Sequence, residues 1–345
     1  MQNFVCAQCG QVLFFENSVC AGCGHQLAYL PEVATLSTII AETPIAVGFP
    51  LRQAGMTYFA ADGTRHKLCG NDTEYAVCNW AIPADSTETF CRSCRLNQTI
   101  PNLGAPGSID DWRRLEAAKR RLLHTLLEYR LPLDGLAFRF LADQGAEKVL
   151  TGHKNGLITI NLAESNDVLR ERMRVEMGEA YRTLLGHFRH EAGHFFWDKL
   201  IGRSVWHDRY RELFGDESAS YSDALERHHR QGPPIDWRTF FVTSYASSHP
   251  WEDWAETFAH YLHMVDTLET ARAFGIAMRG APALSAQPNE RGFQQFALLI
   301  EAWVPVTVAL NSLNRSMGLA DAYPFVLSPA TVEKLRFVHD VIQSV

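Results

Sequence analysis

Cysteine is missing from most of this chain. Residues 95–345 contain none, and all eight cysteines lie between Cys6 and Cys94. A disulfide framework running through the whole protein is therefore excluded. Internal repeats and low-complexity tracts are also absent, which excludes solenoid architectures. The composition, 46% hydrophobic and 21% charged, is ordinary for a globular protein long enough for two domains.

Positive charge is scarce as well. The net charge is −7, and residues 1–105 carry five basic against eight acidic side chains. Nucleic acids and anionic membranes attract basic proteins, so we expect neither as a partner. Residues 1–6 lack the basic and apolar regions of a signal peptide. The most apolar stretch, residues 296–310, is interrupted by Glu301 and Pro305 and is too short to span a bilayer. We therefore expect a cytoplasmic protein.

The cysteines that are present form two groups of four. The first group has the spacing C-x2-C-x10-C-x2-C and consists of Cys6, Cys9, Cys20 and Cys23. The second has the spacing C-x8-C-x12-C-x2-C and consists of Cys69, Cys78, Cys91 and Cys94. Because four thiolates provide tetrahedral coordination, the sequence predicts two structural zinc sites. Crossed pairing between the groups stays open, as does iron in place of zinc.

Histidine is concentrated where cysteine is absent. Nine of the fourteen histidines fall between His187 and His263. Among them, the string His-Glu-Ala-Gly-His places His190 and His194 four residues apart, on one face of a helix, where both can bind one metal ion. Glu191, between them, is placed to take a proton from a metal-bound water. The flanking residues are apolar at helical spacing, as expected for a buried active-site helix.

Catalytic zinc usually has a third protein ligand and an open position. The extended motif HExxHxxGxxH is excluded, because Trp197 and Leu200 stand where it needs glycine and histidine. A downstream helix beginning near Pro250 offers three carboxylates instead: Glu252, Asp253 and Glu256. One of them can bind the metal while the next orients a ligand histidine through its second ring nitrogen. His249, at the start of this helix, is a candidate hydrogen-bond donor to the transition state.

The remaining pattern predicts an α+β fold. A turn-rich linker at residues 102–108 separates residues 1–105 from residues 106–345, which we treat as two domains. A helix with Ser108 as its N-cap follows the linker. Short strands come next, one of them at residues 157–162 after a hairpin turn, and long helices fill the rest. We expect the strand at 157–162 to be an edge that pairs with an extended substrate.

Several long strings of the chain resemble a known family. They lie at residues 6–23, 78–80, 91–96, 181–191 and 249–262. The chain is similar along nearly its full length to bacterial zinc-binding metallopeptidases with an N-terminal zinc-ribbon region, and more broadly to the gluzincin branch of zincin-like peptidases. The resemblance implies that Glu252 is the third zinc ligand and that Glu256 orients a ligand histidine. It also implies that Tyr245, seven residues before Glu252, helps to stabilise the oxyanion.

The favoured interpretation is a zinc-dependent metallopeptidase acting on a protein or peptide, with one catalytic and two structural zinc ions. Glu191 would activate the zinc-bound water, and Tyr245 or His249 would stabilise the oxyanion. Two alternatives stay open. One is a protein- or nucleic-acid-binding module whose metal core is not catalytic, and the other is a zinc hydrolase of a non-peptide amide. The ribbon is expected to recognise a protein or to brace the catalytic domain, and a fragment starting near Ser108 is expected to bind one zinc ion.

Overall fold

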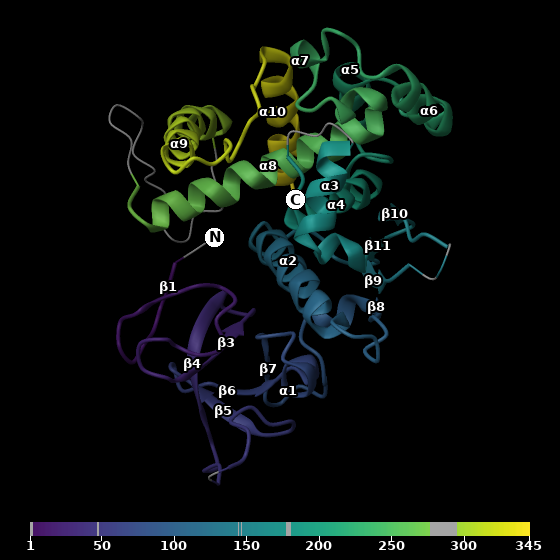
Figure 1. Cartoon of the computed structure of the whole chain (residues 1–345). Coiled ribbons are helices and arrows are strands. Elements are labelled where there is room, and N and C mark those ends of the chain that lie inside the picture. Colours follow the sequence, from purple (N-terminus) through teal and green to yellow (C-terminus); the bar gives the residue numbers. More distant parts are fainter. Residues whose placement is uncertain (1–2, 47, 144, 146, 177–180, 277–294) are drawn as a thin grey trace.

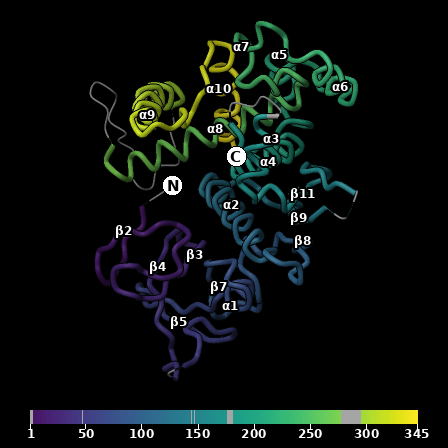
Figure 2. Tube along the Cα trace, viewed as in Figure 1, coloured from purple at the N-terminus to yellow at the C-terminus, as the bar shows by residue number. Residues whose placement is uncertain are grey.

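The structure is a computed structural model that describes residues 3–46, 48–143, 145, 147–176, 181–276 and 295–345. Strands dominate the first part of the chain and helices the rest, so the predicted α+β class is confirmed. In Figures 1 and 2 the N-terminal strands occupy the lower part of the molecule, and the later helices lie above them. Helix α2 (Ser108–Glu128) lies between the two parts.

The N-terminal part is built on strands that the sequence did not reveal. A short hairpin of β1 (Phe4–Val5) and β2 (Val12–Leu13) carries the first cysteine pair. A five-stranded antiparallel sheet follows, in the order β3 (Gln26–Leu30), β4 (Thr35–Ala41), β5 (Thr57–Ala60), β6 (Arg65–Leu68) and β7 (Ala81–Pro83). Helix α1 (Gly70–Tyr75) comes before β7, and a 3-10 turn at Cys94–Leu96 ends this part.

A second sheet joins the two parts of the chain. Its order is β10 (Gly152–Lys154), β11 (Leu157–Asn161), β9 (Ala137–Leu141) and β8 (Asn97–Thr99). Strand β8 precedes the expected domain boundary at residue 105, yet it pairs in parallel with β9 beyond that boundary. Strand β11 lies between β10 and β9, so the prediction that it forms an edge is wrong. Among the described strands, β10 is the edge on that side.

Helix α2 is anchored on both sides. Its predicted apolar stripe is buried, with Trp112 and Leu122 fully inaccessible. Nδ1 of His124 shares a 2.7 Å hydrogen bond with the hydroxyl of Tyr29 in β3. The guanidinium of Arg120 donates to the carbonyl oxygen of Val77 at 2.5 Å. One continuous hydrophobic core therefore runs from the ribbon through α2 into the helical part. The N-cap of α2 is Gly107 in the left-handed region (φ 81°), not Ser108 as predicted.

The helical part surrounds two crossing helices. These are α4 (Leu184–Leu200) and α8 (Pro250–Ala273), which pack directly against each other. The other elements are η2 (Leu162–Ser165), α3 (Asp167–Glu176), α5 (His207–Phe214), α6 (Tyr221–Gln231), α7 (Trp237–Phe240), η3 (Tyr245–Ser248), α9 (Phe296–Ser316) and α10 (Pro329–Gln343). Helices α9 and α10 both contact α8, so α8 is the central helix of this part.

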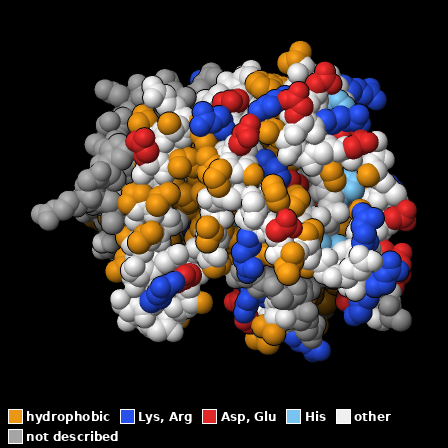
Figure 3. All heavy atoms as spheres, turned by 90° about the horizontal axis from the view of Figure 1, so that it is seen from above, with side chains coloured by type: hydrophobic (Ala, Val, Ile, Leu, Met, Phe, Trp, Pro, Cys, Tyr) orange, Lys and Arg blue, Asp and Glu red, His pale blue; other side chains and the backbone are white. Residues whose placement is uncertain are grey.

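Helix α9 differs from the sequence prediction. It continues through Pro305 and is 21 residues long, so the prediction that this apolar stretch is too short to span a bilayer is wrong as to length. Among the described residues, α9 is the one helix whose length and composition would allow it to cross a membrane. In its most apolar stretch, 28% of the residues are buried. Val304, Val308 and Leu313 are exposed on it. Hydrophobic side chains also gather in the middle of the face seen from above (Figure 3).

Candidate metal centre

The close crossing of α4 and α8 creates the candidate site. Thr183 caps α4 by accepting a hydrogen bond from the amide of Gly186 at 3.0 Å. At the crossing, Gly193 lies so near Ala255 that a Cβ at position 193 would be only 2.8 Å from the Cα of Ala255. The indole of Trp254 donates to the carbonyl oxygen of Gly193 at 2.8 Å. The histidine face of α4 therefore meets the first turns of α8.

Three acceptor atoms converge between these helices. Nε2 of His190 lies 2.9 Å from Oε2 of Glu252 and 3.2 Å from Nε2 of His194. Nε2 of His194 lies 3.4 Å from the same oxygen of Glu252. Ligands at 2.0–2.1 Å from a tetrahedral zinc ion are about 3.3 Å apart, so these separations fit zinc. Oε2 of Glu252 is buried and has no hydrogen-bond partner among the described residues, as a ligand atom should.

Glu256 fixes the orientation of the His190 ring, and Thr243 holds Glu256 in turn. Nδ1 of His190 donates to Oε1 of Glu256 at 2.6 Å, and Thr243 donates to Oε2 of Glu256 at 2.7 Å. With the ring proton held on Nδ1, the Nε2 lone pair faces the other two acceptors. Burial opposes ionisation of Glu256, but the hydrogen bonds from His190 and Thr243 more than offset it and lower its pKa. The structure places Glu256 where the sequence reasoning expected the orienting carboxylate.

The same carboxylates make the site attractive to positive charge. Burial disfavours a charged imidazole, but Glu252 and Glu256 hold the pKa of His190 well above its usual range. Burial likewise opposes ionisation of Glu252, but His194 and His190 hold its pKa well below the usual range. A site that stabilises a proton between two carboxylates also suits a divalent cation. The donor set of two imidazoles and one carboxylate is typical of catalytic zinc.

Asp253 does not compete with Glu252. It is fully buried and forms an ion pair with Lys334 of α10 at 2.5 Å. Burial raises the pKa of Asp253 to about 7 although Lys334 favours its ionised form. Asp253 follows Glu252 directly, so it projects from a different face of the helix. Its carboxylate therefore secures α8 to α10.

Two tyrosines lie behind Glu252. The hydroxyl of Tyr221, the first residue of α6, donates to Oε1 of Glu252 at 2.5 Å. Burial and the charge of Glu252 raise the pKa of Tyr221 and of Tyr245 well above the usual range, and the two phenols also interact with each other. The ring centroid of Tyr245 lies 6.0 Å from that of His190. Tyr245 is predicted from the family resemblance, whereas no sequence pattern points to Tyr221.

The ring of His249 forms hydrogen bonds within the protein and is not free to donate to a transition state. Its Nδ1 accepts from the amide of Trp251 at 3.1 Å and so caps α8. Its Nε2 then donates to the carbonyl oxygen of Ala219 at 3.1 Å. Both ring nitrogens are thus used within the protein, and the arrangement does not support the predicted catalytic role of His249. His249 instead joins the start of α8 to the segment before α6.

Glu191 faces the same region. It is 8% exposed. Its charge contributes to the raised pKa of Tyr221, so the two side chains are close. The carboxylate oxygens of Glu191 are not among the buried atoms without a partner, so they reach solvent and can hold a water molecule.

Aromatic rings line the site beside the metal ligands. The Trp251 ring packs on His194 with centroids 3.9 Å apart. The ring of His153, in the edge strand β10, lies 6.4 Å from that of His194 and stacks on it. The pKa of His153 is lowered to about 4 by burial and by the nearby His194. Trp251 lies within the family string at 249–262 but was given no role from the sequence, and His153 lies in no motif.

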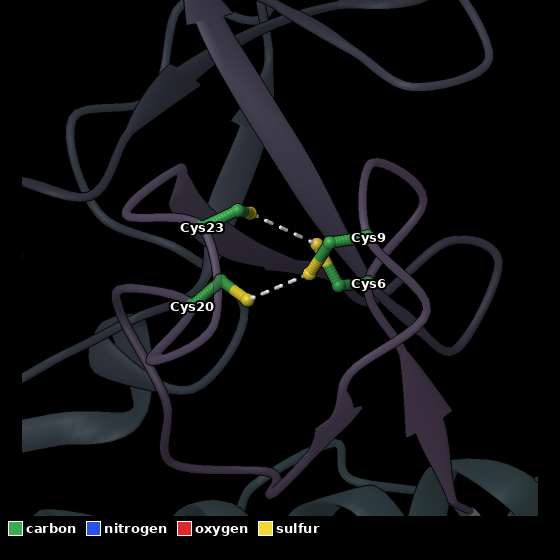
Figure 4. A group of neighbouring side chains, drawn as sticks. All are labelled: Cys6, Cys9, Cys20 and Cys23. Carbon is green, nitrogen blue, oxygen red and sulfur yellow. Dashed lines mark hydrogen bonds between the residues drawn. The ribbon is translucent and has the colours of Figure 1, made fainter.

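The eight cysteines form two separate clusters, each from one of the predicted groups. In the first, shown in Figure 4, the Sγ atoms of Cys6 and Cys23 and those of Cys9 and Cys20 are each 3.6 Å apart. In the second, Sγ of Cys78 lies 3.7 Å from Sγ of Cys91. Thiolates at 2.3 Å from a tetrahedral zinc ion are about 3.8 Å apart, so both clusters fit zinc. The crossed pairing left open by the sequence does not occur.

The two clusters differ in their surroundings. Cys9 and Cys23 of the first cluster are exposed, whereas all four sulfurs of the second are buried. The second cluster lies near Arg120 of α2, whose pKa is raised by the charges of Cys78 and Glu116 despite its burial. A cation beside four thiolates offsets the negative charge that such a zinc site carries.

The comparisons with known proteins agree with this arrangement. A family described as "Putative zinc-binding metallo-peptidase" matches residues 108–341, and a zinc-ribbon domain family matches residues 3–105. The chain belongs to this metallopeptidase family.

Relatives of this zinc-binding metallopeptidase occur in mycobacteria. Proteins of Mycobacterium bovis and of two strains of Mycobacterium tuberculosis, named as uncharacterized proteins, are each 45% identical to it over 358 residues. The similarity covers 100% of this chain and 96% of each relative. No solved structure matches the chain. The metallopeptidase and ribbon matches meet at the predicted linker, at residues 105–108.

Proposed function

We propose that this metallopeptidase hydrolyses peptide bonds in a protein or peptide, with His190, His194 and Glu252 holding a zinc ion. The observation that carries the proposal is the convergence of these three acceptor atoms, 2.9–3.4 Å apart, beside the carboxylate of Glu191. The side chain of His190 is 13% exposed, so solvent reaches the site. A bound zinc ion would polarise the scissile carbonyl group and make water acidic enough to lose a proton near neutral pH.

The residues of the chain then have distinct tasks. Glu191 accepts a proton from the attacking water and transfers it to the leaving amine. Tyr245 is the candidate donor to the developing oxyanion, since its raised pKa keeps the phenol protonated. Glu256, held by Thr243, keeps His190 in the correct tautomer.

The sheet edge next to the site suits an extended substrate. Strand β10 is the edge among the described strands, and its residue His153 lies beside His194. A peptide that adds to β10 through backbone hydrogen bonds would pass the metal ligands with little demand on its sequence. The substrate role first assigned to the strand at 157–162 is therefore transferred to β10.

The test is Glu191→Gln, assayed on an unstructured, fluorescently labelled protein. The carboxamide cannot act as a base, so we expect the rate to fall about 10²- to 10⁴-fold while zinc content is unchanged. The matched control is Glu212→Gln, which changes an exposed carboxylate on α5 that pairs with Arg209. It should cleave at the wild-type rate.

Two results would contradict the proposal. One is Glu191→Gln protein that cleaves as fast as the wild type. The other is wild-type protein that is fully loaded with zinc yet cleaves no member of a varied peptide library. The second result would favour a metal core without catalysis, or a zinc hydrolase of a non-peptide amide.

A further inference from the structure

Tyr221 lies in a segment that hydrogen bonds of the two preceding residues hold in place. Its position begins α6, and Ser220 caps this helix by accepting from the amide of Asp223 at 3.4 Å. Immediately before it, the carbonyl oxygen of Ala219 accepts from His249 at 3.1 Å. The beginning of α6 is therefore attached to the beginning of α8, which carries Glu252.

The ring of Tyr221 is held by aromatic neighbours. It packs edge-on against the rings of His249 and Trp251, with centroid distances of 5.3 Å and 5.7 Å. These contacts leave 38% of the residue exposed but fix the direction of its hydroxyl. Edge-to-face pairs of this kind restrict a ring without help from hydrogen bonds. Removing the hydroxyl alone should therefore leave the ring in place.

The hydroxyl makes the two oxygens of Glu252 unequal. Oε1 accepts the 2.5 Å hydrogen bond from Tyr221. Oε2 accepts no hydrogen bond from the described residues and faces Nε2 of His190 at 2.9 Å and Nε2 of His194 at 3.4 Å. Glu252 itself is 1% exposed, so water does not compete freely for either oxygen.

We propose that Tyr221 is a positioning residue of the metal centre, whose hydroxyl retains Oε1 of Glu252 so that only Oε2 is offered to the cation. The role rests on the proposed function, since it concerns the same three ligands. A carboxylate that binds through both oxygens would supply a fourth protein donor and fill the position that a hydrolytic zinc site keeps open for water. The hydrogen bond from Tyr221 prevents this without adding a ligand.

The inference also explains why α6 is tied to α8. The segment between α4 and α8 supplies no metal ligand, yet its residues Ala219 and Tyr221 both bond to the first turn of α8 or its cap. These two hydrogen bonds place the phenol relative to the carboxylate. Their purpose on this interpretation is to fix how Glu252 binds metal.

The experiment is Tyr221→Phe in the full-length protein, studied with Co²⁺ and with zinc in the absence of substrate. The visible absorption of bound Co²⁺ reports its coordination geometry, and bands weaken as the coordination number rises. His190→Ala, which keeps both cysteine clusters, supplies the spectrum to subtract. We expect Tyr221→Phe to show weaker bands than the wild type and about 10- to 100-fold lower zinc affinity in a chelator competition.

A matched control is available in Tyr75→Phe. Tyr75 also donates to a carboxylate, Oε1 of Glu74, at 2.5 Å, but it lies on α1 in the N-terminal part. Tyr75→Phe removes the same atom from the same kind of contact, and it should leave the Co²⁺ spectrum and the zinc affinity unchanged. In cleavage assays Tyr221→Phe should lower kcat with little change in KM.

The outcomes separate this inference from the proposed function. A Tyr221→Phe spectrum and affinity identical to those of the wild type would overturn the positioning role, even if cleavage fell, because Tyr221 would then act on the substrate. Wild-type protein whose Co²⁺ spectrum equals that of His190→Ala would overturn the proposed function and the inference together. Altered coordination in Tyr221→Phe, without peptide cleavage by any form, would support the inference and count against the peptidase proposal.

Discussion

The contact between Gly193 and Ala255 sets the distance between the two helices that carry the metal ligands. A Cβ at position 193 would lie 2.8 Å from Cα and 3.1 Å from the carbonyl oxygen of Ala255. Both are backbone atoms, so no change of rotamer relieves the overlap. Ordinary contact begins at 3.4 Å, and Gly193→Ala must therefore separate α4 from α8 by about 0.6 Å, the difference between 3.4 and 2.8 Å.

A shift of this size is small for the fold but large for a metal site. The overlap should cost about 1–3 kcal/mol, while alanine in place of a helical glycine returns about 1 kcal/mol. The protein should remain folded, with stability lowered by about 0–2 kcal/mol. Metal–ligand distances, however, tolerate only about 0.2 Å. Since His190 and His194 flank Gly193 and Glu252 precedes Ala255 by three residues, we expect zinc affinity to fall about 10- to 100-fold.

Zinc affinity is measured by competition with a chromophoric chelator, and stability by unfolding in urea. Gly152→Ala is the matched control, because a Cβ at Gly152 meets no atom within 4 Å. It adds the same methyl group and should change neither quantity appreciably. A Gly193→Ala protein with native zinc affinity would refute the reasoning, since the α4–α8 distance would then not control the site.

Glu252→Ala should abolish zinc binding at the triad, whereas Glu256→Ala should weaken it about 10- to 100-fold; a zinc titration giving the reverse order would make Glu256 the ligand. Burial lowers the pKa of His124 to about 4, so the unfolded chain takes up a proton first as the pH falls below about 6.5, and stability is lost between pH 6.5 and 4. In His124→Asn, the free energy of unfolding measured in urea should fall by about 2 kcal/mol less at pH 5 than it does in the wild type. An unchanged pH dependence would count against this. A fragment starting at Ser108 loses β8 and uncovers Trp112, so it should aggregate in sedimentation experiments; a monodisperse fragment holding one zinc ion would show that the two predicted domains are separable.

The helices of the site could be predicted because their patterns are local. The string from His190 to His194 and the carboxylates of α8 repeat at helical spacing, and the structure forms helices over both. The same spacing also distinguishes Asp253, since it does not share a face with Glu252 and Glu256. Asp253 accordingly pairs with Lys334. The family resemblance added the choice of Glu252 as ligand.

The parts of the site that were missed depend on contacts distant in the sequence. Tyr221 lies 31 residues before Glu252, and no motif relates a helix-initiating tyrosine to a carboxylate on another helix. His153 reaches His194 from the edge of a sheet. His249 was a candidate hydrogen-bond donor to the transition state, but the bonds to Trp251 and Ala219 occupy both its nitrogens. A side chain's type and spacing show what it can do, and its partners decide what remains available.

The domain division illustrates the same point for the fold. A turn-rich linker and the end of the cysteines both favour a boundary near residue 105, and the two family matches meet there. Strand β8 lies before this boundary but forms its sheet with β9 after it, and Lys119 of α2 donates to the side chain of Asn97 in β8. The buried carboxylate of Glu116 joins the same group. Lys119 and Glu116 form an ion pair within α2 and are both inaccessible to water, so the loss of Asn97 would leave each of them with one hydrogen bond unmade. The N-terminal part therefore contacts α2 through β8, and α2 in turn packs against the helix α4 that carries His190 and His194, while the division into two domains stays a prediction.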